Sequence, residues 1–320
     1  MAVSWKRALK LTFLFFLLVL SGCNQSRPVG TYDFHIYTID TRSMLGLLAE
    51  MDGKAFVAGD EISNRRVRVM QDNTRPGVLF DQLVTHEGLS SHGLNGITVV
   101  ASQCRIQQGL GANRLSFSNK QQSFSFTAGI ATTHVTDYLA EIAKKQIDYD
   151  MPAKMSSISL QLREKPIDDI LSAIMLADGL EAENFSAALK LQSADYRHCA
   201  NRPLIQSTKY DGRYSFSQGR GMACVSERDG HIASRLCEPA EEFDLSQIYL
   251  LGFVQKHGAG LNRKLVLETP EGVMLLSPGN AFGKHNGQII DITESGVRLR
   301  ELIRKNDQYI ASERFLKFPQ

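Results

Sequence analysis

The sequence predicts an α+β protein with a lipoprotein signal peptide, two βαββα modules in tandem and a small all-β domain at the C-terminal end. Three observations support this prediction. A short apolar segment follows basic residues near the start, an internal repeat recurs with a constant offset, and residues 243–320 contain short apolar runs separated by Gly, Pro or Asn. With 320 residues, 43% of them hydrophobic, the chain is long enough for two or three domains.

Residues 1–22 are predicted to be a lipoprotein signal peptide, and residues 23–31 a tether. Basic residues precede the apolar run Leu11–Leu20, which is shorter than the roughly 20 residues that a transmembrane helix needs. The sequence Leu20-Ser21-Gly22-Cys23 then resembles the bacterial lipobox, which makes Cys23 the expected lipidation site. An ordinary signal peptide with an incidental cysteine and an uncleaved anchor are the alternatives.

The charge of the chain argues against a general affinity for nucleic acid. The formal net charge is +2, and Lys6, Arg7 and Lys10 all lie in the predicted leader, so the mature chain carries about 2 − 3 = −1. Nucleic-acid binding needs a basic surface that neutralises phosphates. We therefore expect no nucleic-acid partner.

Export places the remaining four cysteines in an oxidising compartment, where disulfides form. Four cysteines can pair in three ways: Cys104, Cys199, Cys224 and Cys237. The sequence contains no CxxC motif, which would have suggested a zinc or redox site. The pairing that we favour is Cys224–Cys237, on either side of an expected turn at Asp229-Gly230. Cys104 and Cys199 are then left to pair or to stay free.

Residues 32–192 contain the internal repeat. Five clusters recur in the same order, and each counterpart lies 91 positions later. The clusters are Ile39, Leu48-Ala49-Glu50, Val67, Val69 and Gly88-Leu89, matched by Ile130, Leu139-Ala140-Glu141, Ile158, Leu160 and Gly179-Leu180. Hydrophobic periodicity and a proline at each second helix predict a β-α-β-β-α order in both copies, 32–105 and 123–192, joined by an exposed linker at 106–122.

The segment SISLQLREKPIDDILSAIMLADGLEAE in the second copy resembles the secretin and TonB short N-terminal domain. That resemblance implies a protein-contact module with no chemistry of its own. Residues 193–242 form a Cys-containing connector for which the pattern predicts no fold.

Residues 243–320 predict a β-sandwich-like or barrel-like domain with hairpins at Glu271-Gly272 and Asn286-Gly287. This domain resembles the PilP family of type IV pilus assembly lipoproteins, which is akin to the homology region of the type II secretion clamp protein. The residues that carry the resemblance, in family order, are Phe243-Asp244-Leu245, Tyr249–Gly252, Thr269–Gly272, Pro278-Gly279-Asn280, Gly283, Asn286-Gly287, Ile292-Thr293-Glu294 and Ser312-Glu313-Arg314.

The PilP resemblance implies a non-enzymatic lipoprotein that links the inner-membrane assembly subcomplex to the outer-membrane secretin. Its implied partners are the periplasmic N-terminal domains of the secretin, the inner-membrane pilus alignment proteins and the membrane itself. Docking through strand edges and a hydrophobic cleft is expected. The docking candidates are Leu250, Leu251, Phe253, Phe282, Ile289, Ile290, Arg298 and Arg300.

Two alternatives stay open. An outer-membrane lipoprotein that assembles or stabilises the secretin is one, because Asn24 rather than Asp follows Cys23; the family resemblance favours the inner membrane. A cell-wall enzyme or a transporter's substrate-binding lipoprotein is the other. The sequence contains no H-E-x-x-H or G-x-S-x-G motif, so we expect no catalytic residue, metal or cofactor.

Overall fold

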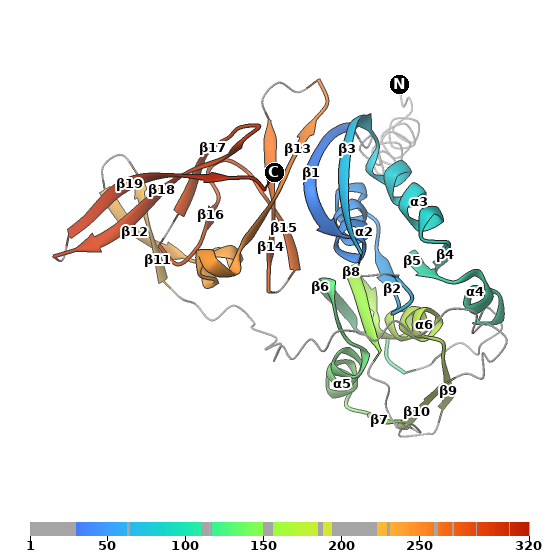
Figure 1. Cartoon of the computed structure of the whole chain (residues 1–320). Helices are drawn as coiled ribbons and strands as arrows, with labels where there is room; N and C mark the ends of the chain where they lie inside the picture. Colours follow the sequence, from blue (N-terminus) through green and yellow to red (C-terminus); the bar gives the residue numbers. More distant parts are fainter. Residues whose placement is uncertain are drawn as a thin grey trace, which may run out of the picture. The chain divides into compact units, whose positions relative to one another are not determined.

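The computed structural model describes residues 30–319, except for 63–64, 110–114, 116, 150–155, 185–187, 194–222, 229–230, 259–261, 271, 286 and 307. The predicted leader and Cys23 lie outside the described residues. Within them, no helix is both long and apolar enough to cross a membrane. Strands outnumber helices and form several sheets, which confirms the α+β class (Figure 1).

The first segment forms two β-layers around two helices. Its elements are β1 (Tyr32–Asp40), α2 (Thr41–Asp52), β2 (Phe56–Ala58), β3 (Arg66–Thr74), α3 (Pro76–His86), β4 (Ser90–Leu94) and β5 (Ile97–Ala101). β1 pairs with β3, β2 runs parallel to β5, and β5 pairs with β4. Helix α4 (Gln103–Gly109) follows.

The second segment has the same order of elements and the same pairings. Its elements are β6 (Gln121–Ala131), α5 (Thr132–Ala143), β7 (Gln146–Tyr149), β8 (Ser157–Pro166), α6 (Ile167–Asp178), β9 (Leu180–Asn184) and β10 (Ala188–Ser193). β6 pairs with β8, β7 runs parallel to β10, and β10 pairs with β9.

The correspondence extends to single hydrogen bonds at the start of each first helix. The backbone N–H and the hydroxyl of Thr41 both donate to the carbonyl oxygen of Arg65, and those of Thr132 donate to that of Ser156. The carbonyl oxygen thus satisfies a backbone N–H that a helix N-terminus otherwise leaves unpaired. The partners in the two segments lie 91 positions apart, the same offset that relates the sequence clusters.

The C-terminal part is a β-sandwich preceded by a hairpin. The hairpin is β11 (Ala223–Arg228) with β12 (His231–Leu236), followed by the short helices η2 (Pro239–Glu242) and η3 (Leu245–Gln247). The sandwich strands are β13 (Tyr249–Lys256), β14 (Arg263–Thr269), β15 (Gly272–Leu276), β16 (Ala281–Phe282), β17 (Gly287–Ile292), β18 (Gly296–Lys305) and β19 (Gln308–Lys317). One layer is β13–β14–β15, and the other is β16–β17–β18–β19.

The three parts are connected by shared sheets, which the sequence pattern did not predict. β1 pairs with β13, so one five-stranded sheet has the order β15-β14-β13-β1-β3, and Figure 1 shows blue β1 beside orange β13. β2 pairs with β8, which gives a second five-stranded sheet, β4-β5-β2-β8-β6. Strand pairing across segments supplies hydrogen-bond partners for backbone N–H and C=O groups at strand edges, which each segment alone would expose.

Both faces of the β13–β15 layer are covered. Leu251 and Val254 belong to a core shared with α2 and α3, whereas Phe253 and Leu265 belong to the core of the sandwich. A third core fills the second segment and includes Ile97 and Val99 of the first. Because residues from one part enter the core of another, the three expected domains pack as neighbours with common interiors.

Candidate functional site

Most of the docking candidates lie inside the protein. Leu251, Phe253, Phe282 and Ile289 are at most 1% exposed, and Leu250 is half-buried at the edge of the sandwich core. Phe253 stacks on His35 of β1 with ring centroids 4.7 Å apart, and the Arg263 guanidinium covers its ring. These side chains stabilise the fold, and the prediction that they form a docking surface is wrong for the four buried residues.

The edge of β13 is also occupied, because this strand lies between β14 and β1. Gly252 permits the close approach of the two chains. Its φ is +145°, and a Cβ there would overlap the carbonyl oxygen of His35. Strand addition to the C-terminal domain therefore has to use another edge: among the described strands of the sandwich, β15 ends one layer, and β16 and β19 end the other.

Three docking candidates, Ile290, Arg298 and Arg300, come together on the solvent side of the β17–β18–β19 layer. Residues that are directly opposite on paired strands share a face. Arg298 lies opposite Phe315 of β19 and Asp291 of β17, and Arg300 lies opposite Glu313. Ile290 occupies the bulge of β17 beside this group.

We call this solvent side the outer face and define it by Ile290, Arg298, Arg300 and Phe315. Ile290 is 39% exposed and Phe315 is 44% exposed, although both are large apolar side chains, and both arginines are exposed. Exposed aromatic and arginine side chains are enriched at the centres of protein–protein interfaces. Phe315 was absent from the sequence-based candidates, because its neighbours do not show which side of β19 faces solvent.

The β18–β19 hairpin extends beyond β17, since the β17 ladder ends opposite Arg300 while β18 and β19 pair as far as Lys305 and Gln308. Near its end, Ile303 and Ile310 lie opposite each other and are 44% and 50% exposed. An isolated two-stranded ribbon gains little from its own packing. Besides the outer face, Ile303 and Ile310 therefore form a second exposed apolar patch on the C-terminal domain.

The five-stranded sheet β15-β14-β13-β1-β3 ends at β15 on one side and at β3 on the other. Between β3 and α3 lies a depression of about 650 Å³, lined by Arg65 just before the strand, by Arg66 and Arg68 on the strand, and by Leu79 and Leu83 on the helix. Arg66 is paired with Glu268 at 3.3 Å, and Arg68 covers the Tyr37 ring. An apolar floor with a cationic rim suits a protein contact.

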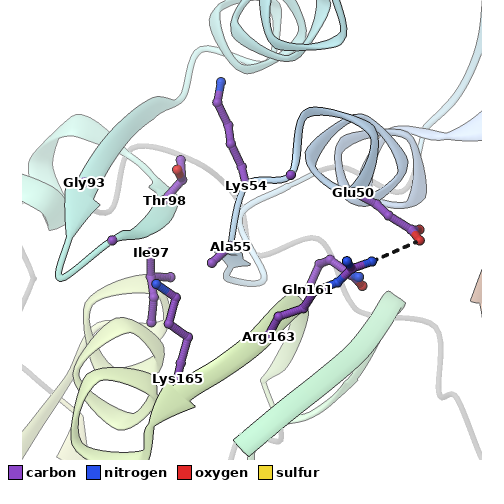
Figure 2. Close-up of a pocket in the computed structure, with 11 residues that line it drawn as sticks. Glu50, Lys54, Ala55, Gly93, Ile97, Thr98, Gln161, Arg163 and Lys165 are labelled. Atoms are coloured by element: carbon purple, nitrogen blue, oxygen red, sulfur yellow. Dashed lines mark ion pairs between the residues drawn. The ribbon is translucent and has the colours of Figure 1, made fainter. Parts of the chain in front are cut away.

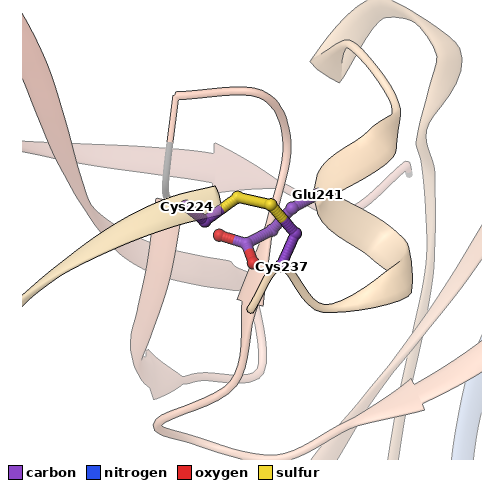
Figure 3. A group of neighbouring side chains, drawn as sticks. All are labelled: Cys224, Cys237 and Glu241. Carbon is purple, nitrogen blue, oxygen red and sulfur yellow. A yellow bond between two sulfur atoms is a disulfide. The ribbon is translucent and has the colours of Figure 1, made fainter. Parts of the chain in front are cut away.

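Two of the predicted disulfide positions, Cys224 and Cys237, are bonded to each other, with Cα atoms 4.9 Å apart (Figure 3). The Glu241 carboxylate lies beside them and accepts a hydrogen bond from the Glu238 backbone N–H at 2.7 Å. This trio has the composition of a metal site, but the disulfide leaves no thiolate to bind an ion. Cys104 is also disulfide-bonded, whereas Cys199 lies outside the described residues.

The connector just before residue 243 is attached to the sandwich. Glu238 accepts a hydrogen bond from the Ala281 backbone N–H at 3.1 Å, and Gly283 N–H donates to the Ala240 carbonyl at 2.9 Å. Together with the disulfide, these bonds place β11, β12 and η2 with the C-terminal domain. Its expected start at residue 243 is therefore too late.

Comparison with known proteins agrees with this boundary. The family model "Pilus assembly protein, PilP" matches residues 221–318, under a third of the chain. No curated protein sequence matches the chain.

Solved structures that resemble the chain include domains of two bacterial proteins. A domain of the type IV pilus biogenesis lipoprotein PilP from Pseudomonas aeruginosa PA01 is 18% identical, with a TM-score of 0.24, and the match covers 26% of this chain and 94% of that one. A domain of the Neisseria meningitidis PilP pilot protein is 22% identical, with a TM-score of 0.23 and coverages of 29% and 80%. On the evidence of the family match, the C-terminal part of this protein, residues 221–318, is a PilP-family domain.

Proposed function

We propose that this protein is a non-enzymatic lipoprotein of type IV pilus biogenesis, facing the periplasm and anchored in the inner membrane through Cys23. Its C-terminal domain would bind the periplasmic N-terminal domains of the outer-membrane secretin. Inner-membrane pilus alignment proteins would be its partners on the other side. The observation that carries this proposal is the PilP family match over residues 221–318.

The outer face is the docking surface in this proposal. It combines exposed apolar side chains, Ile290 and Phe315, with the charged Arg298 and Arg300. The adjacent edge strand β19 offers backbone groups for strand addition. Leu251, Phe253, Phe282 and Ile289 are excluded from the surface by their burial.

We further propose that the two segments of shared topology are tandem secretin-N-like modules that act as protein-contact units. The support is their common element order and the pairing of β1 with β13. In this arrangement a module of the chain already occupies one edge of the PilP-family domain. A secretin domain would then bind at a different edge of that domain.

Co-purification from membranes tests the proposal. A tagged full-length chain, cross-linked in cells and extracted in detergent, is expected to carry the secretin and the alignment proteins. Membrane fractionation of the same cells is expected to place it in the inner membrane, and a Cys23→Ser variant is expected to be released from membranes. Recovery in the outer membrane with the secretin alone would instead support the alternative of a secretin-assembly lipoprotein.

A further inference from the structure

The depression between β3 and α3 follows the unpaired edge of β3. Seven consecutive residues, Arg65–Gln71, line it. Successive side chains of a strand point to opposite faces of its sheet, so a cavity lined by an unbroken run of residues lies beside the strand rather than over one face. β1 occupies the other side of β3, which leaves the outer edge. We call this depression the edge groove.

The edge groove has the backbone chemistry and the length for an added strand. An edge strand presents a row of N–H and C=O groups that have no partner in its own sheet. Seven residues of extended chain span about 23 Å, at about 3.3 Å per residue. The volume of about 650 Å³ separates this edge from α3, so an extended segment can pair with β3 and lie against the helix.

The side of the edge groove toward α3 is apolar. Val67 and Val69 of β3 line it together with Leu79 and Leu83 of α3. Val69 and Leu79 belong to the core that α2 and α3 share with the sheet, and Val67 and Leu83 pack against that core. Every second side chain of an added strand would point to this side and cover apolar surface there.

The opposite side of β3 carries arginines. Arg66 and Arg68 alternate with the two valines, and their contacts show which way they point. Arg66 is ion-paired with Glu268 of β14 at 3.3 Å, and Arg68 lies over the Tyr37 ring. Tyr37 packs against the sandwich core, on the face away from α3. The remaining side chains of an added strand would lie on this face, beside the arginines.

The edge groove has an excess of positive charge. Arg65 lies 4.0 Å from Glu87, and Arg66 is paired with Glu268. No carboxylate pairs with Arg68 in the described part of the chain, and no acidic residue of that part lines the groove. An acidic side chain on a partner would therefore meet an uncompensated arginine on β3.

A second cavity, of about 460 Å³, lies where the two βαββα segments meet and lacks an apolar side (Figure 2). Among the described residues that line it, only Ala55 and Ile97 have apolar side chains. Its Arg163 lies 3.9 Å from Glu50, which lines the same cavity. Hydrophobic side chains of a partner have little surface to pack on there, so the edge groove is the better site for a protein segment.

We propose that the edge groove binds an extended segment of a partner protein in which acidic and apolar residues alternate. The segment adds to the sheet as a strand beside β3. Its apolar side chains point toward α3, and its acidic side chains lie beside Arg66 and Arg68. This inference rests on the proposed role of the βαββα segments as protein-contact units, and it does not involve the outer face.

Calorimetric titration of the full-length chain in detergent tests this proposal with two peptides, acetyl-EVEVEVE-amide and acetyl-EEEEVVV-amide. They have the same composition and charge, but only the first alternates. We expect the alternating peptide to bind at least about tenfold more tightly, a difference of about 1.4 kcal/mol. Arg68→Glu is expected to weaken its binding by a similar factor, because like charges then face each other. Lys264→Glu, at an exposed position on β14 of the same sheet, is the matched control and is expected to leave binding unchanged.

Hydrogen exchange identifies the edge that the peptide uses. We expect the alternating peptide to slow amide exchange in β3 and to leave exchange in β19 unchanged. Protection in β19 instead of β3, equal binding of the two peptides, or no binding of either at millimolar concentration would overturn the proposal. A dimer of the chain alone that the alternating peptide dissociates would also overturn it, because the groove would then belong to a second copy. Secretin binding by the Arg68→Glu variant, measured in parallel, reports on the outer face separately.

Discussion

Asp178, the last residue of α6, is a fully buried carboxyl group whose titration is coupled to folding. Burial, together with the nearby Asp60, raises its pKa to about 6, although the hydroxyl groups of Thr132 and Ser156 donate to it and Arg105 lies near, which lower the pKa. The folded state therefore keeps a proton that the unfolded state releases near pH 4. Its contribution to stability is complete below pH 4 and is lost as the pH rises to about 6.

We predict that Asp178→Asn removes this pH dependence. Because about two pKa units separate the two states, the stability of the variant relative to the natural chain should rise by roughly 2 kcal/mol between pH 4 and pH 6.5. Urea denaturation at pH 4.0, 5.0 and 6.5 measures the difference. A difference that stays constant with pH would contradict the assigned titration.

A second prediction compares the helix ends of the two segments. Gly53 ends α2 with a φ of +69°, and its counterpart Lys144 ends α5 with a φ of +56°. Left-handed φ favours glycine, because a Cβ is strained there. We expect Lys144→Gly to stabilise the protein by about 1 kcal/mol, measured by thermal denaturation, and Gly53→Ala to destabilise it by a comparable amount. Destabilisation by Lys144→Gly would show that the lysine side chain contributes more than its backbone strain costs.

The pairing of β1 with β13 is the element on which the arrangement of the protein depends. Gly252 is needed there for its positive φ and for the absence of a side chain facing His35. We predict that Gly252→Ala separates the two strands and destabilises the protein by roughly 2–4 kcal/mol. Hydrogen exchange should show protection lost in β1 and β13 but kept in β17 and β18. Unchanged protection in β1 would mean that this pairing does not hold the sheet together.

Element boundaries followed from the sequence where local signals are strong. A proline marks each second helix, as expected: Pro76 is the first residue of α3, and Pro166 immediately precedes α6. The short strands β4 and β9 have no place in the predicted β-α-β-β-α order and were missed, because they carry little apolar alternation. The joining of β2 to β8 was also missed, since a three-residue strand contains no signal for which edge it will meet.

The docking residues were predicted with less success for a physical reason. Alternation alone would place Leu251 and Phe253 on the same face of β13, but the bulge between Leu250 and Gly252 sends them into two different cores, one on each face of the strand. Only the packing of α2 against one face and of the second sandwich layer against the other reveals this. By contrast, Arg298 and Arg300 were placed correctly on a solvent-exposed face, because charged side chains that alternate with apolar ones on a strand seldom face a core.

At the scale of the whole molecule, the proposed function depends on one accessible surface. The PilP-family domain uses one layer of its sandwich to join the rest of the chain, through β13 and β1, and keeps the other layer exposed. The outer face and the β19 edge therefore remain for an external partner. This division gives the two layers different roles, attachment within the chain and recognition outside it.

The most direct test measures how tightly the full-length chain in detergent binds the purified periplasmic N-terminal domains of the secretin. The affinity is compared between the natural sequence and the double variant Arg298→Glu, Arg300→Glu. Removal of arginines from the centre of an interface costs 2 kcal/mol or more, so we predict binding that is weaker by about thirtyfold or more. Lys264→Glu, on the other layer, should bind as the natural chain does. Undiminished binding by the double variant would contradict docking through the outer face, and failure of the natural chain to bind would contradict the proposed link to the secretin.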